Sequence, residues 1–309
     1  MLIKRLVSHY CAPRLAALGL LAIYPIPSQS TAVAVIIGKS GMVIATDSKG
    51  MTSGVVEGQT ERIGERKLVK AFIIQHRFAT VCIGYCTYNF SRNGEPPEVI
   101  DYDFGTWILN IERGLPDKIS FDAFVDTVNN ELGKIIPKLR APIAAGAMQP
   151  KNAWDKFEVV SQYVITGYES GTPRLSVLEF YVDWEAKRLQ GPYQVPVEPN
   201  GPLLGKNRGY MFGVKEAATE FLNRNSYAYK QATVLCPKAF DNFITNRAIS
   251  LNESTSLAKV LVRIEENTNP SWVGGGVQAV TILPTGRADV LREEDLPKTR
   301  TGQKKQTPK

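Results

Sequence analysis

The sequence predicts an α+β fold in which two antiparallel sheets pack together and helices cover them from outside. The chain has 309 residues, of which 43% are hydrophobic and 22% are charged. This is enough apolar material for a sizeable core, and it excludes a disordered chain and a multi-span membrane protein. Short β-branched runs occur in pairs, and amphipathic helical stretches follow the pairs. That order of elements is typical of layered α+β proteins.

The first half of the chain contains two pairs of short apolar runs, each joined by a polar or glycine-containing turn. Such pairs predict β-hairpins. The turns are Gly38–Gly41 and Gln75–Arg77, and the four expected strands are Thr31–Ile37, Met42–Thr46, Lys70–Ile74 and Phe78–Ile83.

Helices are expected after these hairpins and again near the end. The first covers Asp103–Arg113, and the second begins at a Ser120 cap and carries apolar residues at helical spacing from Phe121 to Ile135. The second half predicts further strands and helices. Its expected strands are Val159–Gly167, Leu175–Val182, Arg188–Val197, Val277–Leu283 and Ala288–Leu291, and its expected helical stretches are Val214–Asn223 and Glu253–Glu266.

The net charge of +7 comes from the two ends of the chain. Eight of the 37 basic residues lie in residues 1–30 and 298–309, which contain no acidic residue, leaving 29 against 30 acidic ones. The body is therefore close to neutral, so a nucleic-acid partner is not expected. We expect one domain over residues 31–296 and a disordered basic tail over residues 297–309.

Residues 1–30 have the pattern of a signal peptide. A basic stretch precedes the apolar run Leu15–Tyr24, and Ser28-Gln29-Ser30 follows as a small-x-small cleavage site. Cleavage after Ser30 would make Thr31 the first residue, place the protein outside the cell or in the periplasm, and leave no stable membrane insertion. Should the segment be a propeptide instead, a cytoplasmic location is expected.

The cysteines predict buried thiols and neither a disulfide framework nor a metal site. Cys11 lies in the segment to be removed, which leaves the odd set Cys82, Cys86 and Cys236. The whole chain has two histidines, so a Cys/His metal site is poorly supplied. We expect no metal and no cofactor.

The stretch Thr31–Lys49 resembles the start of a mature proteasome β-subunit. It has a leading threonine, an apolar strand, a glycine turn and a second strand that ends in Ala-x-Asp-Ser-basic. Lys70–Gly84 resembles the strand that carries the family's active-site lysine and the glycine after the next strand.

Two later stretches extend the resemblance over most of the body. Ile165–Tyr168 leading to Pro173–Leu175 is similar to the family's third hairpin, and Gly274–Gly276 is similar to its glycine-rich approach to the last strands. The resemblance implies the four-layer αββα sandwich of N-terminal nucleophile (Ntn) hydrolases. It also implies a catalytic set of Thr31, Asp47, Lys70 and Gly84, and it allows a homo-oligomer.

A threonine at the start of a chain can use its own α-amine as the base that activates its hydroxyl. An ordinary α-amine titrates at about 7.7–8.0, so part of it is free base near neutral pH. Lys70 would add positive charge that favours the deprotonated forms, and Asp47 would hold that ammonium. Gly84 would leave its N–H open to an oxyanion, which is the role the family gives to that glycine.

The first hairpin predicts that these groups are neighbours. A Gly38–Gly41 loop pairs Ile37 with Met42, and extending this register brings Thr31 opposite Ser48 and beside Asp47. The register leaves open which side of the sheet each side chain faces, because a one-residue slip or a bulge reverses it.

Several features depart from the family or leave alternatives. Lys67 would replace Lys70 if the strand were shifted by three residues. Ser30 stands where most family precursors have glycine, which fits signal peptidase better than self-cleavage. Pro270 and Val273 stand where the family has its supporting aspartate and serine, so the set is incomplete unless one of three nearby polar residues substitutes. Those are Asn267, Asn269 and Ser271.

Two functional hypotheses of different classes follow. The first is an exported threonine-type hydrolase that cleaves peptide or other amide bonds. The alternative is a catalytically inactive member of the same fold that serves as a binding or assembly module. A third, a basic-tailed protein held at a membrane surface by its N-terminal helix, has the least support.

Overall fold

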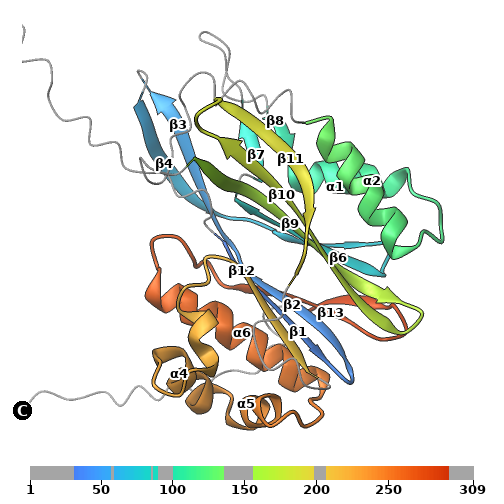
Figure 1. Ribbon diagram of the computed structural model, residues 1–309, viewed down its shortest axis with the longest axis vertical. Helices are drawn as coiled ribbons and strands as arrows, with labels where there is room; N and C mark the ends of the chain where they lie inside the picture. Colours follow the sequence, from blue (N-terminus) through green and yellow to red (C-terminus); the bar gives the residue numbers. More distant parts are fainter. Residues whose placement is uncertain are drawn as a thin grey trace, which may run out of the picture.

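The structure is a computed structural model that describes residues 31–56, 59–84, 86–89, 100–135, 156–197 and 207–291. Within these ranges the chain is a mixed α and β protein with two five-stranded antiparallel sheets (Figure 1). This confirms the expected mixed composition and the two sheets. The segments expected as a signal peptide or propeptide (1–30) and as a basic tail (297–309) lie outside the described residues.

The first sheet is built around the hairpin at the start of the described chain. Its order is β12-β1-β2-β13-β14. The hairpin pairs Ile37 with Met42, as the sequence predicts, although Gly38 and Gly41 also pair and the turn shortens to Lys39 and Ser40. The strands are β1 (Ala32–Gly38), β2 (Gly41–Asp47), β12 (Arg208–Gly213), β13 (Val277–Ile282) and β14 (Ala288–Leu291).

The second sheet has the order β11-β10-β9-β6-β5. All of its strands were expected from the sequence, and β9 and β10 run two or three residues further than predicted at most ends. The strands are β5 (Ala71–Ile74), β6 (Phe78–Gly84), β9 (Phe157–Glu169), β10 (Thr172–Asp183) and β11 (Arg188–Val195).

Two small ribbons complete the β structure, and neither was predicted. They are β3 (Lys49–Val56) with β4 (Gln59–Lys67), and β7 (Thr87–Asn89) with β8 (Ile100–Asp103). Charged residues and glycines interrupt the apolar pattern of β3 and β4, so their sequences lack the usual strand signal.

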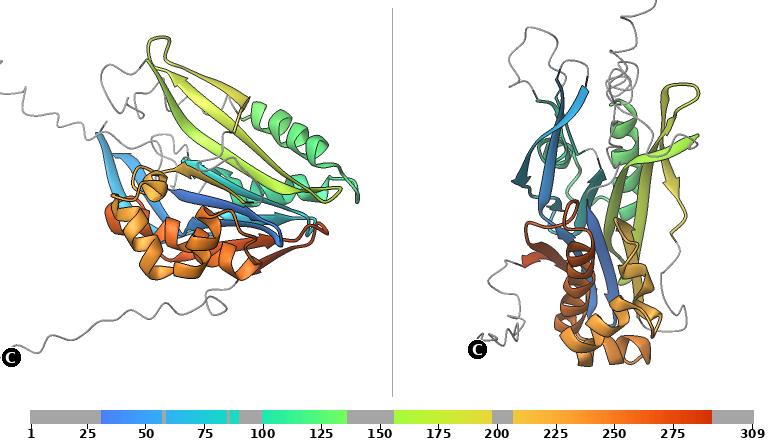
Figure 2. Two further views of the ribbon diagram at one scale, coloured as in Figure 1. Left: turned by 60° about the horizontal axis from the view of Figure 1, so that its bottom comes forward. Right: turned by 90° about the vertical axis from the view of Figure 1, so that its left-hand side faces the viewer.

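The helices divide between the outer faces of the two sheets (Figure 2). The first pair packs on the second sheet: α1 (Phe104–Arg113), capped by Asp103, and α2 (Phe121–Gly133), capped by Ser120. The remaining helices pack on the first sheet: η1 (Ala218–Leu222), α4 (Tyr227–Leu235), α5 (Pro237–Ile244) and α6 (Leu251–Thr268). A complete capping box of Ser250 and Glu253 starts α6.

One helical prediction was wrong in extent, and three further elements were missed besides the two ribbons. The stretch Val214–Asn223 contains a 3₁₀ turn over Ala218–Leu222 rather than a full helix. Strand β12 precedes it, and α4 and α5 follow it. No described helix is long and apolar enough to span a membrane.

Three apolar clusters fill the spaces between these elements. One lies between the first sheet and its helices, one between the second sheet and its helices, and the third between the two sheets. In β1 the side chains alternate, so Val33, Val35 and Ile37 face the other sheet while Ala32 and Ala34 face the helices. This alternation determines where the residue before β1 points.

Candidate functional site

Thr31 directly precedes β1 and is buried. It lies two residues before Val33, which packs between the sheets, and its hydroxyl meets a lysine that precedes the second sheet. Its carbonyl accepts a hydrogen bond from the N–H of Val214 at 2.9 Å. Gly213, with φ of +72°, lies so close that a Cβ there would come within 1.9 Å of the same carbonyl oxygen.

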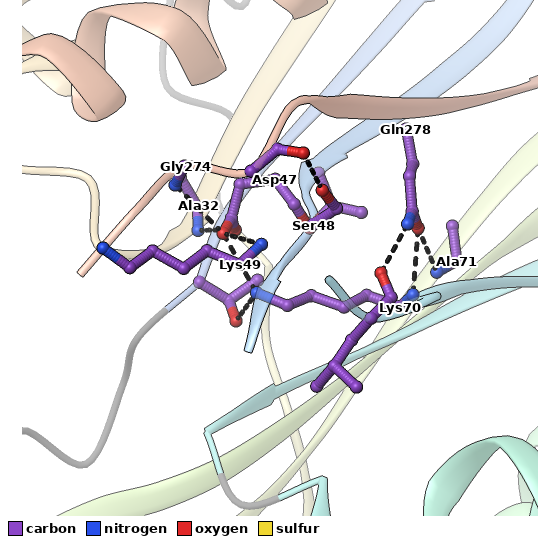
Figure 3. A network of polar contacts seen from close by, with 12 residues as sticks. Ala32, Asp47, Ser48, Lys49, Lys70, Ala71, Gly274 and Gln278 are labelled. Atoms are coloured by element: carbon purple, nitrogen blue, oxygen red, sulfur yellow. Dashed lines mark hydrogen bonds and ion pairs between the residues drawn. The ribbon is translucent and has the colours of Figure 1, made fainter. Parts of the chain in front are cut away.

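Asp47 is the last residue of β2, and its carboxylate accepts hydrogen bonds from four residues (Figure 3). Oδ1 accepts from the N–H of Ala32 at 3.0 Å. Oδ2 accepts from the N–H groups of Lys49 and Gly274 at 3.1 and 3.4 Å and from the ammonium of Lys70 at 3.0 Å. Burial raises the pKa of Asp47 above its usual value, and the charge and hydrogen bond of Lys70 act in the opposite direction.

Lys70 joins Asp47 to Thr31. Its Nζ donates to Thr31 Oγ1 at 2.7 Å and lies 3.0 Å from Asp47 Oδ2, and the side chains of the lysine and the aspartate are 4% and 1% exposed. An ammonium at this distance from a hydroxyl stabilises the alkoxide form. Lys67, the other lysine considered, is the last residue of β4 and pairs with Lys49, and its side chain lies outside the described part.

Gly84 ends β6 with φ of +86°, a conformation that glycine adopts without steric cost. Gly213 lies against the Thr31 carbonyl. A Cβ placed on Gly213 would also lie 3.1 Å from a side-chain carbon of Ile83, the residue before Gly84. The end of β6 is therefore on the same side of the molecule as Thr31.

Pro270 and Val273 stand where the family that the sequence resembles has an aspartate and a serine, and the structure shows what this loop contacts. Val273 is buried in the apolar cluster under the first sheet, and the carbonyl of Pro270 accepts from Lys49 Nζ at 2.7 Å. Asn267 is exposed, and the Asn269 amide donates to Glu265 at the end of α6. The backbone N–H of Gly274 in this loop donates to Asp47 Oδ2 at 3.4 Å.

Ser48 holds the same loop through hydrogen bonds to its glycine carbonyls. Its N–H lies within hydrogen-bonding distance of the carbonyls of Gly274 and Gly276, at 3.1 and 2.9 Å, and its hydroxyl donates to the carbonyl of Gly275. Gly275 and Gly276 have φ of +77° and +99°. The loop thus supports the site through main-chain groups, and glycines supply the conformation that this requires.

Sequence reasoning placed Thr31, Asp47 and Lys70, and the structure brings these three together. It missed two supporting residues, Ser48 and Gln278. The signal for Ser48 was its place directly after Asp47, whereas the spacing of Gln278 in a strand gives no hint of its contacts, because they cross from one sheet to the segment before the other.

The described hydrogen bonds that join Thr31, Lys70 and Asp47 involve no cysteine. All three that follow Thr31 are free thiols, Cys82 and Cys236 buried and Cys86 half-buried, which confirms the expected buried thiols for the first two. Burial raises the pKa of Cys82 and raises that of Cys236 to about 12, so both stay protonated near neutral pH. Within the described ranges, no group of three or more His, Cys, Asp or Glu side chains is placed to hold a metal.

Comparison with known proteins gives a weak structural likeness. No protein-family model matches the chain, and no curated protein matches it. Among solved structures, a similar one is the Anbu (Gly-1) mutant from Hyphomicrobium sp. strain MC1, which is 14% identical over 85% of each chain with a TM-score of 0.40. At this identity and TM-score the likeness assigns neither an activity nor a substrate.

Proposed function

We propose that the chain is a threonine-type N-terminal nucleophile hydrolase that cleaves peptide or other amide bonds, with its sheets and helices arranged as a four-layer αββα sandwich. The observation that carries the proposal is the contact of Lys70 Nζ with Thr31 Oγ1 at 2.7 Å. The same Nζ lies 3.0 Å from Asp47 Oδ2. A buried lysine and aspartate are costly to maintain, and here the lysine of the pair contacts the Thr31 hydroxyl.

Removal of residues 1–30 activates the site in this proposal. In the uncut chain the nitrogen of Thr31 is an amide and has no basic lone pair. A cut between Ser30 and Thr31 turns it into an α-amine that sits on the same residue as the hydroxyl. The ammonium of Lys70 beside it lowers the pKa of such an amine, which increases the fraction of free base near neutral pH.

The reaction then proceeds through an ester. The α-amine takes the proton of the Thr31 hydroxyl while Oγ1 attacks the substrate carbonyl, and the N–H at Gly84 is assigned to the oxyanion. As the tetrahedral intermediate collapses, the C–N bond of the substrate breaks, and the protonated α-amine of Thr31 gives the proton to the leaving amine. Water, deprotonated by the same α-amine, hydrolyses the ester and restores the threonine.

The alternative is a binding or assembly module with the same fold and no turnover. Val273 and Pro270, which stand where the family has its serine and aspartate, favour it, because neither residue has a side-chain hydroxyl or carboxylate. Export, a peptide or amide substrate and assembly into a homo-oligomer remain part of the proposal.

The test is turnover of a fluorogenic peptide-amide panel by protein whose first residue is Thr31, verified by N-terminal sequencing. Thr31→Ala removes the nucleophile, so we expect kcat to fall by at least about 10³-fold. Thr31→Ser keeps a hydroxyl and should retain part of the activity. The matched control is Thr281→Ala, another buried threonine, on β13. Equal turnover by the wild type and Thr31→Ala would contradict the proposal.

A further inference from the structure

Gln278 lies on β13 of the first sheet and reaches toward the segment that carries Lys70 (Figure 3). It pairs through its backbone with Thr46 of β2, one residue before Asp47. Val280 and Ile282 have the same parity and pack between the two sheets. The side chain of Gln278 therefore points across the gap between the sheets.

The segment Leu68–Lys70 has no partner strand in either five-stranded sheet. β4 ends at Lys67 and β5 begins at Ala71, whose ladder partner is Val81. The backbone groups of these three residues consequently need other partners. The N–H of Leu68 donates to the carbonyl of Ser48 at 2.7 Å.

The amide of Gln278 makes three further contacts with this stretch of backbone. Its Oε1 accepts from the N–H of Lys70 at 2.9 Å and, more weakly, from that of Ala71 at 3.5 Å. Its Nε2 donates to the carbonyl of Leu68 at 2.5 Å. One side-chain amide thus takes the place of a neighbouring strand's peptide group. It satisfies the acceptor before Val69, which is the Leu68 carbonyl, and the donor after it, which is the Lys70 N–H.

We infer that Gln278 is a positioning residue for Lys70, and this inference rests on the proposed function. By fixing the main chain on either side of Val69, the amide determines where the lysine side chain starts, and hence whether its ammonium reaches both Thr31 Oγ1 and Asp47 Oδ2. A displacement of about 1 Å at a catalytic group can cost about 100-fold in rate. Val69 itself is 67% exposed, so packing around it contributes little to holding the segment.

The test compares Gln278→Leu with Gln190→Leu, in the chain that begins at Thr31. Gln190 is another half-buried strand glutamine, and its amide contacts Asp183 and not the segment before β5. For Gln278→Leu we expect kcat to fall at least about tenfold with KM within about twofold, because the lysine is misplaced while the rest of the site is kept. Gln190→Leu should match the wild type.

A second readout does not need turnover. The pKa of the Thr31 α-amine, measured by nitrogen NMR, depends on how close the Lys70 ammonium lies. This ammonium and Asp47 form the charged pair beside Thr31. In Gln278→Leu the ammonium moves away, so the amine should titrate higher, by on the order of half a pH unit. If Gln278→Leu does not fold, Gln278→Glu is used, which keeps the acceptor for Lys70 but presents a carboxylate to the carbonyl of Leu68.

The outcomes separate the two proposals. An active wild type whose kcat and amine titration are unchanged in folded Gln278→Leu, or in Gln278→Glu, overturns the role of Gln278 and leaves the hydrolase intact. An inactive wild type whose amine titration still shifts in the Gln278 variant overturns the hydrolase and supports the positioning of Lys70. Equal losses in Gln278→Leu and Gln190→Leu would also overturn the inference, since the effect would then be general.

Discussion

The hairpin β1–β2 and the loop Asn269–Gly276 both hold Asp47, but they do so by different means. The hairpin places the N–H of Ala32 against Oδ1 through the regular register of an antiparallel ladder. The loop places the N–H of Gly274 against Oδ2 through an irregular backbone that Ser48 fastens. A ladder fixes positions by repetition and tolerates many side chains, whereas a loop of this kind depends on particular backbone conformations.

The largest expected effect is on the ladder side, at Gly213. Alanine there would have φ of +72° and a Cβ 1.9 Å from the Thr31 carbonyl oxygen, so the strand β12 would have to separate from β1. We expect a loss of about 4 kcal/mol or more of unfolding free energy, from strain and overpacking together. Chemical denaturation measures it.

The control for this variant is Gly171→Ala. Gly171 has almost the same φ, +75°, but open space around its Cβ position. It should lose about 1 kcal/mol, from the left-handed conformation alone. Similar losses at the two sites would show that the close approach to Thr31 is not what requires glycine.

The next effect concerns the charge pair that the ladder and the loop both support. Asp47→Asn leaves the buried ammonium of Lys70 without its counter-charge, and we expect about 3 kcal/mol of destabilisation together with loss of the proposed hydrolysis. Adding Lys70→Met to Asp47→Asn removes the buried charge, so thermal unfolding should show most of the stability restored while activity stays absent. A double variant no more stable than Asp47→Asn would contradict this account.

The smallest expected effect is on the loop side, at Gly275. Its φ is +77°, and a Cβ there would lie 3.0 Å from the backbone nitrogen of Lys49 and from the Ser48 hydroxyl oxygen. Alanine should therefore lower the unfolding free energy by about 2 kcal/mol. Gly286→Ala, with φ of +85° and free space, should cost about 1 kcal/mol and leave turnover unchanged. Equal stability and turnover in the two variants would show that the loop conformation is not needed to hold Asp47 in place.

Much of the architecture could be read from the sequence because its signals are local. The hairpin register from Ile37 and Met42, the cap at Ser120, and the alternation of strands and helices all follow from neighbouring residues. Strand β12 and helices α4 and α5 were missed. Their apolar runs are short, and β12 is stabilised by its pairing with the distant β1.

The sequence by itself determined that Thr31 lies beside Asp47, since a hairpin register follows from turn length and strand spacing. Only the tertiary structure decided that the Thr31 hydroxyl meets Lys70 between the sheets, that the glycine loop supports Asp47 through its backbone, and that Gln278 holds the lysine segment. These contacts join residues from 39 to 227 positions apart along the chain. No local pattern encodes them, because they depend on how two sheets pack against each other.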